Sequence, residues 1–278
     1  MKKLTAEQVQ RYEDAGAIHP IRAFSKERAN AYFAELERGE AKYGAGFRKT
    51  LRTKAHLSLK WVDEIVHDPG ILDAVEDLIG PDILLYNMTV WIKDARDSHF
   101  VGWHQDSTYF PLEPAVQVAA WVALTDSVAE NGNVKYLAGS HKVGQLEHGR
   151  GEEGSLLGKG QHVLEPPELP VTDIFLQPGE MSLHHTRLVH FSEPNLSPRR
   201  RIGIAISYIP TSVVCTSPTR HTAMLVRGVD RYGHFEPEPR VRFDFDPEVN
   251  DFRDDAIRRF WQASEEQAAV QERMFAKA

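Results

Sequence analysis

Residues 83–93 read ILLYNMTVWIK, and this stretch decides the expected fold class. It is rich in β-branched and aromatic side chains, which favour strands. Similar short segments follow as far as residue 227, and clusters of Gly, Pro, Asn and Ser separate them. Many short strands with frequent turns predict a sandwich or a barrel rather than repeated βαβ units. We therefore expect a mainly β protein.

Helical patterns flank the β-rich region on both sides. Residues 5 to about 40 carry apolar side chains at helical spacing, and residues 68–80 form a short helical pattern bounded by Asp-Pro and Gly-Pro. Residues 250–276 again show a helical pattern. These features predict a single domain over residues 1–278. Its parts are a helical N-terminus (1–81), a β core (about 82–227) and a C-terminal lid or helix (228–278).

Charge and composition limit the possible partners and the compartment. The formal net charge is −7, and the chain has no polybasic run, so we expect neither nucleic acid nor an anionic membrane surface as a partner. Neither a signal peptide nor an apolar run long enough to cross a bilayer is visible. Cys215 is the only cysteine, so an internal disulfide is impossible, and a reducing cytoplasm is the expected location.

A candidate for metal binding lies in GWHQDSTYF, residues 102–110. Side chains two residues apart in a strand point to the same face. His104 and Asp106 would therefore present an imidazole and a carboxylate to one point. A His-x-Asp pair also arises by chance, and the ordinary alternative is a polar strand end.

A third ligand is expected from the histidine-rich stretch that follows Gly179, where His184, His185 and His190 are the candidates. Two histidines and one carboxylate occupy one face of an octahedral iron(II) ion and leave three positions open. A bidentate 2-oxo acid can take two of these positions, and dioxygen the third. Arg201 begins the strand-like RIGIAISYI, and its planar guanidinium suits the distal carboxylate of 2-oxoglutarate. Arg199 and Arg200 are expected to face solvent or the preceding turn.

Three motifs then identify a known family. They are WHQDSTYF (103–110), AWVALTDSVAENGNVKYLAGSH (120–141) and PGEMSLHHTRLVHFSEPNLSPRRR (178–201). In these motifs the chain resembles the phytanoyl-CoA dioxygenase (PhyH) family of iron(II)/2-oxoglutarate-dependent oxygenases, over about residues 82–210. The resemblance implies a double-stranded β-helix (jelly roll, cupin-like) core with flanking helices. It also implies iron ligands at His104, Asp106 and His190, and an arginine for 2-oxoglutarate at Arg201.

The resemblance implies further residues around the cosubstrate. Trp121 and Lys93 match family residues near 2-oxoglutarate, and Asn87, Gln105 and His185 are expected in the same pocket. The ordinary alternative for each is a packed or solvated strand residue. The family usually has glycine where this chain has Phe191, which leaves the size of the substrate open. The ENG (130–132) and AGSH (138–141) segments are expected to be structural turns.

The resemblance also implies the type of reaction. Halogenating relatives lack the metal carboxylate, so Asp106 favours hydroxylation or another oxidation of a C–H bond, with dioxygen consumed and succinate and CO2 released. The overall acidity offers no large basic surface for a coenzyme A tail, so a small metabolite or natural-product intermediate is the expected substrate. A non-catalytic, ligand-binding jelly roll and a zinc-dependent hydrolase with the same ligands are the alternatives.

Three segments are candidates to cover the site, namely residues 44–59, 142–160 and 218–240. The last segment holds His221, Arg227 and Arg231, which together with Phe191 are the expected substrate contacts. The alternative for this segment is a solvated loop with local ion pairs to Asp230, Glu236 and Glu238.

Overall fold

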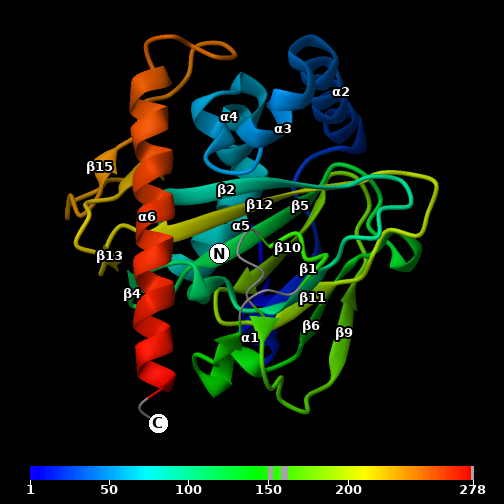
Figure 1. Ribbon diagram of the computed structural model, residues 1–278, viewed down its shortest axis with the longest axis vertical. Coiled ribbons are helices and arrows are strands. Elements are labelled where there is room, and N and C mark those ends of the chain that lie inside the picture. Colours follow the sequence, from blue (N-terminus) through cyan, green and yellow to red (C-terminus); the bar gives the residue numbers. More distant parts are fainter. Residues whose placement is uncertain (150–152, 158–161, 277–278) are drawn as a thin grey trace.

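A computed structural model describes residues 1–149, 153–157 and 162–276. Two β-sheets form its centre, as Figure 1 shows. The large sheet runs in the order β1 (Ala17–Arg22), β10 (Glu180–His185), β5 (Val118–Ala123), β12 (Arg201–Pro210), β2 (Ile83–Lys93), β14 (Thr222–Arg227) and β15 (Glu236–Pro237). The small sheet runs in the order β3 (Val101–His104), β11 (His190–Ser192), β6 (Val134–Leu137) and β9 (Val171–Ile174). This mainly β, cupin-like arrangement is the fold class that the sequence predicts.

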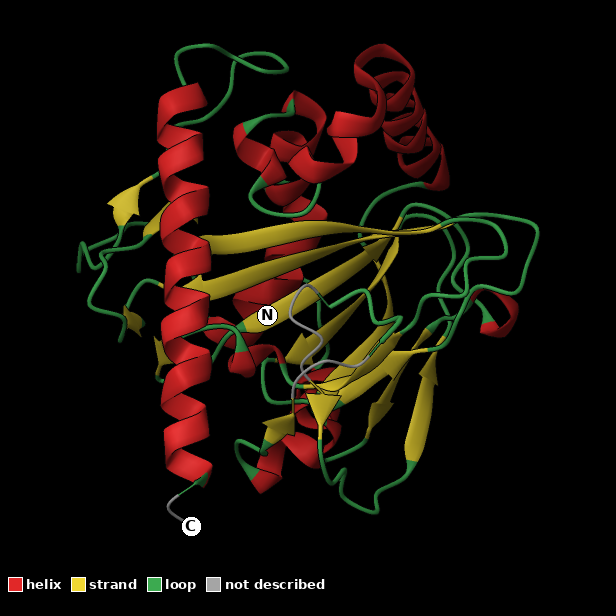
Figure 2. Cartoon of the chain, in the orientation of Figure 1, coloured by secondary structure: helices red, strands yellow, loops and turns green. Residues whose placement is uncertain are grey.

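Helices cover the outer face of the large sheet, while the small sheet lies on its other side (Figure 2). They are α1 (Ala6–Ala15), α2 (Lys26–Tyr43), α3 (Phe47–Thr50), α4 (Lys60–Val66) and α5 (Pro69–Ile79). Ile204 and Ile206 of β12 are fully buried and belong to the same apolar cluster as Ile65 of α4 and Val75 of α5. The alternate β12 residues therefore face inward, between the sheets.

The C-terminal helix α6 (Asn250–Phe275) runs along the side of the two sheets (Figure 1). Its Phe260 is buried with Leu84 and Tyr86 of β2 and with Leu112 of the short strand β4 (Leu112–Glu113). β4 pairs with β13 (Val214–Cys215), and β7 (His148–Gly149) pairs with β8 (His162–Val163). Among the described residues, none of the helices combines the length and the apolar composition that crossing a bilayer requires.

The N-terminal region is not continuously helical, contrary to the prediction for residues 5 to about 40. Gly16 ends α1 in a left-handed conformation, with φ of 82°. The next residues form β1, which pairs antiparallel with β10 at the edge of the large sheet. Pro20 explains the break, because a proline inside a helix lacks the N–H that the helix needs and clashes with the preceding turn. The β core thus begins at residue 17 rather than near 82.

Candidate metal centre

The candidate metal centre lies in the small sheet, where β3 and β11 pair antiparallel. His104 of β3 is the direct register partner of His190 of β11, and their ring centroids are 4.0 Å apart. One donor atom from each of His104, Asp106 and His190 lies within 4.8 Å of the other two. The structure therefore brings together the three residues that the sequence nominated.

Asp106 reaches this point from just beyond the strand. β3 ends at His104, and Asp106 begins a 3-10 turn over Asp106–Thr108. Gln105 between them is extended, with φ of −114° and ψ of 133°, so the alternation of faces continues for one more residue. The Asp106 Oδ1 atom lies 3.7 Å from His104 Nε2 and 3.9 Å from His190 Nε2. The expected common face is present, although Asp106 is not a strand residue.

Backbone carbonyls set the tautomer of both histidines. His104 Nδ1 lies 2.9 Å from the Gly102 carbonyl oxygen, and His190 Nδ1 lies 2.9 Å from that of Leu188. A carbonyl only accepts hydrogen bonds, so each Nδ1 carries a hydrogen and each Nε2 offers a lone pair to the centre. Burial, together with the neighbouring His104, holds the pKa of His190 well below its ordinary value. This favours the neutral imidazole that binds metal.

The environment of Asp106 likewise favours the form that binds metal, the ionised carboxylate. Burial by itself would raise the pKa of Asp106, but the close approach of His104, His184 and His190 lowers it well below the ordinary value. Two imidazoles and one ionised carboxylate, with donor atoms within 4.8 Å of one another, match the donor set of an iron(II) site with open positions. The residues therefore fit the metal that the sequence motifs imply.

His184 is a third histidine at this centre, and the sequence motifs left it without an assigned role. Its side chain is buried, and neither ring nitrogen has a hydrogen-bond partner among the described residues. Its Nε2 lies 3.6 Å from Asp106 Oδ2, the oxygen on the far side from the two ligand histidines. On β10 it is the register partner of Ala119, two residues from Trp121 on the same face of β5. Only this strand pairing, and no local motif, indicates that His184 rather than His185 points inward.

A cavity opens beside the triad and Arg201. Its lining combines all three candidate ligands with aromatic and small side chains and one arginine: Trp91, Val101, His104, Asp106, Trp121, Val134, His184, His190, Phe191, Ser192, Arg201 and Ala205. The Trp121 indole packs against Gly203, where a side chain would not fit, because a Cβ at residue 203 would lie only 2.0 Å from Trp121 Cζ2. We call this cavity the triad–arginine cavity.

Arg201 lines this cavity, and Lys93 lies beside Arg201 with its Nζ bonded to Ser192 and to the Glu193 carbonyl. Arg201 on β12 is the register partner of Lys93 on β2, and both are almost fully buried. The Arg201 guanidinium carbon lies 5.2 Å from the Trp121 ring centroid, and Nη1 donates a hydrogen bond to the Gly132 carbonyl. Its Nε has no partner among the described residues. Burial lowers the pKa of Arg201 to about 10, and burial and the nearby Arg201 lower that of Lys93 to about 6.

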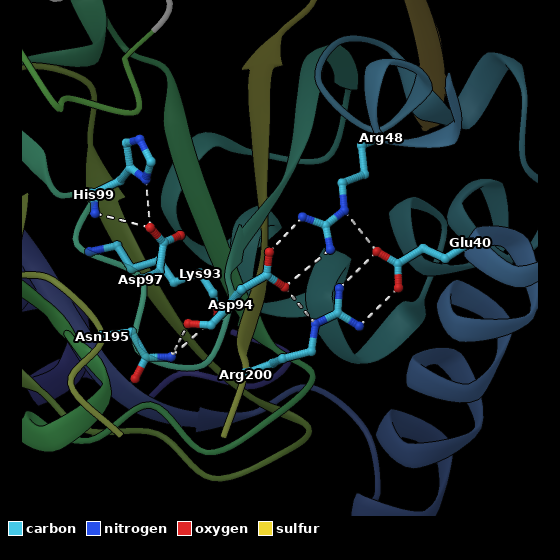
Figure 3. Close-up of polar contacts among 8 residues, drawn as sticks. All are labelled: Glu40, Arg48, Lys93, Asp94, Asp97, His99, Asn195 and Arg200. Atoms are coloured by element: carbon cyan, nitrogen blue, oxygen red, sulfur yellow. Dashed lines mark hydrogen bonds and ion pairs between the residues drawn. The ribbon is translucent and has the colours of Figure 1, made fainter. Parts of the chain in front are cut away.

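Asp94 follows Lys93 in the chain, and Arg200 precedes Arg201. Both belong to the ion-pair network drawn in Figure 3. Arg200 binds Glu40 and Asp94, and Arg48 binds the same two carboxylates. This network joins α2 and α3 to the ends of β2 and β12, and so stabilises the strand ends that carry Lys93 and Arg201. Arg200 was expected to face solvent or a turn, and it instead forms these ion pairs. The ENG turn is structural, as expected, and its Gly132 holds Arg201.

A second, larger cavity lies next to His104 and Asp106. We call it the outer cavity. It is lined by Arg52, Thr53, Asn87, Thr89, Trp91, His104, Asp106, Tyr109, Phe110, Ala119, Leu157, Ala205, Ser207, Phe260, Trp261 and Ser264. Trp91, His104, Asp106 and Ala205 line both cavities. His104 and Asp106 therefore stand at the junction between a cavity that Arg201 lines and a larger cavity that α6 helps to enclose.

The three expected covering segments contribute unequally to the outer cavity. Residues 44–59 supply Arg52 and Thr53, and residues 142–160 supply Leu157. Residues 150–152 and 158–160 of the latter segment lie outside the described residues. The described segment 218–240 supplies none of the lining residues. The remaining wall comes from α6, within the region 228–278 that the sequence suggested as a lid.

Several expected pocket residues lie elsewhere. The Gln105 amide bonds to the Gly144 and Arg187 carbonyls and to the Leu146 N–H, so it anchors the following loop. His185 Nδ1 accepts a hydrogen bond from the Arg187 N–H. Neither residue lines either cavity, because each follows an inward-facing residue by one position. Asn87 lines the outer cavity rather than the one with Arg201, and Phe191 lines the triad–arginine cavity.

The expected substrate contacts of segment 218–240 also lie away from both cavities. Arg227 pairs with Asp73 and Glu76 of α5. Arg231 pairs with Asp82, and His221 Nδ1 lies 2.7 Å from the Tyr86 hydroxyl. The structure thus gives each of these residues a local partner and does not bring any of them to the triad.

Comparison with known proteins agrees with this geometry. A model of the phytanoyl-CoA dioxygenase (PhyH) family matches residues 3–203, a range that contains the triad and Arg201. A probable alpha-ketoglutarate-dependent hypophosphite dioxygenase from Stutzerimonas stutzeri is 29% identical over 159 residues, which are 55% of this chain and 54% of that protein. The chain spans about half the length of the first curated relatives it matches.

Solved structures extend the likeness to nearly the whole chain. The non-heme monooxygenase ThoJ, in its apo form, is 32% identical with a TM-score of 0.85, over 95% of this chain and 99% of that one. The ThoJ–Ni complex superposes with a TM-score of 0.79, over 94% of this chain and 99% of that one.

Proposed function

The chain belongs to the phytanoyl-CoA dioxygenase family of iron(II)- and 2-oxoglutarate-dependent oxygenases, and from this premise we propose that it hydroxylates, or otherwise oxidises, an unactivated C–H bond of a small molecule. Dioxygen and 2-oxoglutarate are consumed, and succinate and CO2 are released. The observation that carries the proposal is the position of His104 and Asp106 between two cavities, one of which the buried Arg201 lines.

His104, Asp106 and His190 would hold the iron. The Nδ1–H groups of His104 and His190 donate to backbone carbonyls, which orients both Nε2 lone pairs, and such outer contacts strengthen metal binding. This donor set leaves positions open for 2-oxoglutarate and dioxygen. When bound, iron(II) with these two partners supplies an oxidant able to remove a hydrogen atom from a C–H bond.

Arg201 would bind the distal carboxylate of 2-oxoglutarate in the triad–arginine cavity. Its unpartnered Nε and its planar fork suit a carboxylate, because two parallel charge-assisted hydrogen bonds then replace missing partners. Lys93, the register partner of Arg201, lies beside it and would take up a proton when the dianion binds, and Trp121 lines the cavity. The low dielectric of this buried site strengthens the attraction.

The substrate would occupy the outer cavity. Its aromatic and aliphatic walls would exclude water around the reacting C–H bond, and His104 and Asp106 are among its lining residues. The ionised Asp106 occupies the metal position that is vacated in halogenating relatives, which favours hydroxylation over halogenation.

The experiment is an assay of succinate formation by the wild type and His104→Ala. Both proteins receive iron(II), 2-oxoglutarate, dioxygen and a metabolite library, and products are followed by mass spectrometry. We expect succinate and oxidised product from the wild type only. The proposal fails if the wild type releases no succinate with any compound, or if His104→Ala releases as much. Product formation with zinc and without dioxygen would instead identify a hydrolase.

A further inference from the structure

We propose that Arg52 binds an anionic group of the substrate, so that the enzyme acts on amphipathic carboxylic acids. The inference rests on the proposed function only in taking the outer cavity as the substrate site. Arg52 belongs to the segment just after α3, not to the basic segment 218–240 that the sequence suggested for substrate contacts.

Arg52 is held at the edge of the outer cavity by its own backbone. The Val90 N–H donates to the Leu51 carbonyl at 2.8 Å, and the Thr89 hydroxyl donates to the Arg52 carbonyl at 2.9 Å. The segment therefore runs alongside β2. This places the Arg52 guanidinium carbon 4.8 Å from the ring centroid of Trp91, a residue that lines both cavities.

None of the described residues gives the Arg52 guanidinium an acidic partner. Among the described residues, its only side-chain hydrogen bond goes from Nη2 to the Leu156 carbonyl at 2.7 Å, and no carboxylate lies within ion-pair distance. Arg48, one helical turn earlier, pairs with both Glu40 and Asp94. Partial burial lowers the pKa of Arg52, although the group stays protonated at neutral pH. A partly desolvated cation with one neutral acceptor gains more from a bound carboxylate than a surface arginine does.

The other walls define the rest of the ligand. Phe110, Phe260 and Trp261 form an aromatic wall, and Leu157 closes the side next to Arg52. Asn87 and Ser207, register partners on β2 and β12, are the polar groups at the floor. A ligand that fills this cavity contacts apolar surface along its body and one cation at its end. A single guanidinium balances one carboxylate, whereas a phosphate dianion calls for more donors.

A structural role makes a different prediction. If Arg52 only joined the Leu156 carbonyl to the Trp91 ring, the charge of the ligand would not matter. Binding selectivity between an acid and its neutral amide therefore separates the two roles. The tryptophans that line the cavity, Trp91 and Trp261, report binding there through their fluorescence.

The test uses the full chain with iron(II) and saturating 2-oxoglutarate under anaerobic conditions, which prevents turnover. The probes are ω-phenylalkanoic acids from phenylacetate to 6-phenylhexanoate, each with its amide and amine counterpart, and 2-phenylethylphosphonate. Wild type, Arg52→Gln, Arg52→Glu and the matched control Arg48→Gln are titrated by tryptophan fluorescence. Arg48→Gln also removes a guanidinium from this segment, but the Arg48 guanidinium does not line the outer cavity.

We expect the wild type and Arg48→Gln to bind the best acid at least about tenfold more tightly than its amide, which corresponds to about 1.4 kcal/mol. Arg52→Gln should lose this preference, and Arg52→Glu should prefer the amine. The proposal is overturned if the wild type binds no acid, binds acid and amide equally, or prefers the phosphonate. It is also overturned if Arg52→Gln keeps the preference. Succinate formation tests the oxygenase activity separately. The proposed activity and the proposed role of Arg52 can therefore be disproved independently of each other.

Discussion

His104 and His190 lie directly opposite each other across the β3–β11 pair, with their ring centroids 4.0 Å apart. The residues are 86 positions apart in the chain, so the pairing of two short strands brings both Nε2 atoms to Asp106. A metal bound here would connect the two strands, and its binding site exists only in the folded state. Its binding energy is therefore coupled to folding.

This coupling predicts metal-dependent stability. A metal ion at 100 times its dissociation constant should raise the free energy of unfolding by about 2.7 kcal/mol. Thermal unfolding with iron(II) under anaerobic conditions, or with nickel(II), should show a higher midpoint than with a chelator. His190→Ala should abolish the difference. An equal shift in His190→Ala would place the metal elsewhere.

His184 should tune the metal affinity through Asp106. Its Nε2 lies 3.6 Å from Asp106 Oδ2, so a hydrogen bond to this oxygen would leave Oδ1 for the metal. Loss of such an outer contact lowers metal affinity by about 10- to 100-fold, and we expect this for His184→Leu in a competitive titration with a chelating dye. His185→Leu changes the next residue, which lines neither cavity, and should leave the affinity unchanged. Equal losses would indicate general disruption of β10.

Gly203 should be required for 2-oxoglutarate binding. The Cβ of Gly203→Ala would lie 2.0 Å from Trp121 Cζ2, so the indole must move into the triad–arginine cavity or distort β12. Overpacking of this kind costs about 1–3 kcal/mol. We expect calorimetry to show about tenfold or greater loss of 2-oxoglutarate affinity, with metal affinity unchanged. Gly46→Ala is the matched control, because no atom lies within 4 Å of its added Cβ.

The affinity for 2-oxoglutarate should depend on pH through Lys93. Burial and the nearby Arg201 lower its pKa to about 6, so the free protein holds this amine mostly uncharged at pH 7.5. A bound dianion favours the ammonium form and raises the pKa, so binding takes up a proton. Affinity should then rise as pH falls from 9 to 7, by at most about tenfold per pH unit. Calorimetry in buffers of different ionisation enthalpy measures the proton uptake.

Lys93→Met supplies the control for this linkage. The variant should bind 2-oxoglutarate more weakly, with an affinity that changes little between pH 7 and 9. A wild-type affinity that is flat over the same interval, with no proton uptake, would contradict the prediction.

The sequence alone determined the parts of this protein that depend on neighbours in the chain. Strand periodicity and the two-residue spacing of His104 and Asp106 predicted a mainly β protein with a local pair of donors. The family motifs then identified His190 and Arg201. Helix termini were also visible, but the helical spacing within residues 5–40 hid β1, because an edge strand is defined by its pairing with β10.

Only the tertiary structure decided which side chains share a cavity. The register of β10 on β5 turns His184 inward and leaves His185 outside, and no local pattern distinguishes the two residues. Arg227 and Arg231 looked like candidate substrate contacts but have acidic partners, whereas Arg52 lies in the outer cavity without one among the described residues. The physical reason is that hydrogen-bond register and ion pairing join residues far apart in the chain, and one-residue shifts exchange the two faces of a strand.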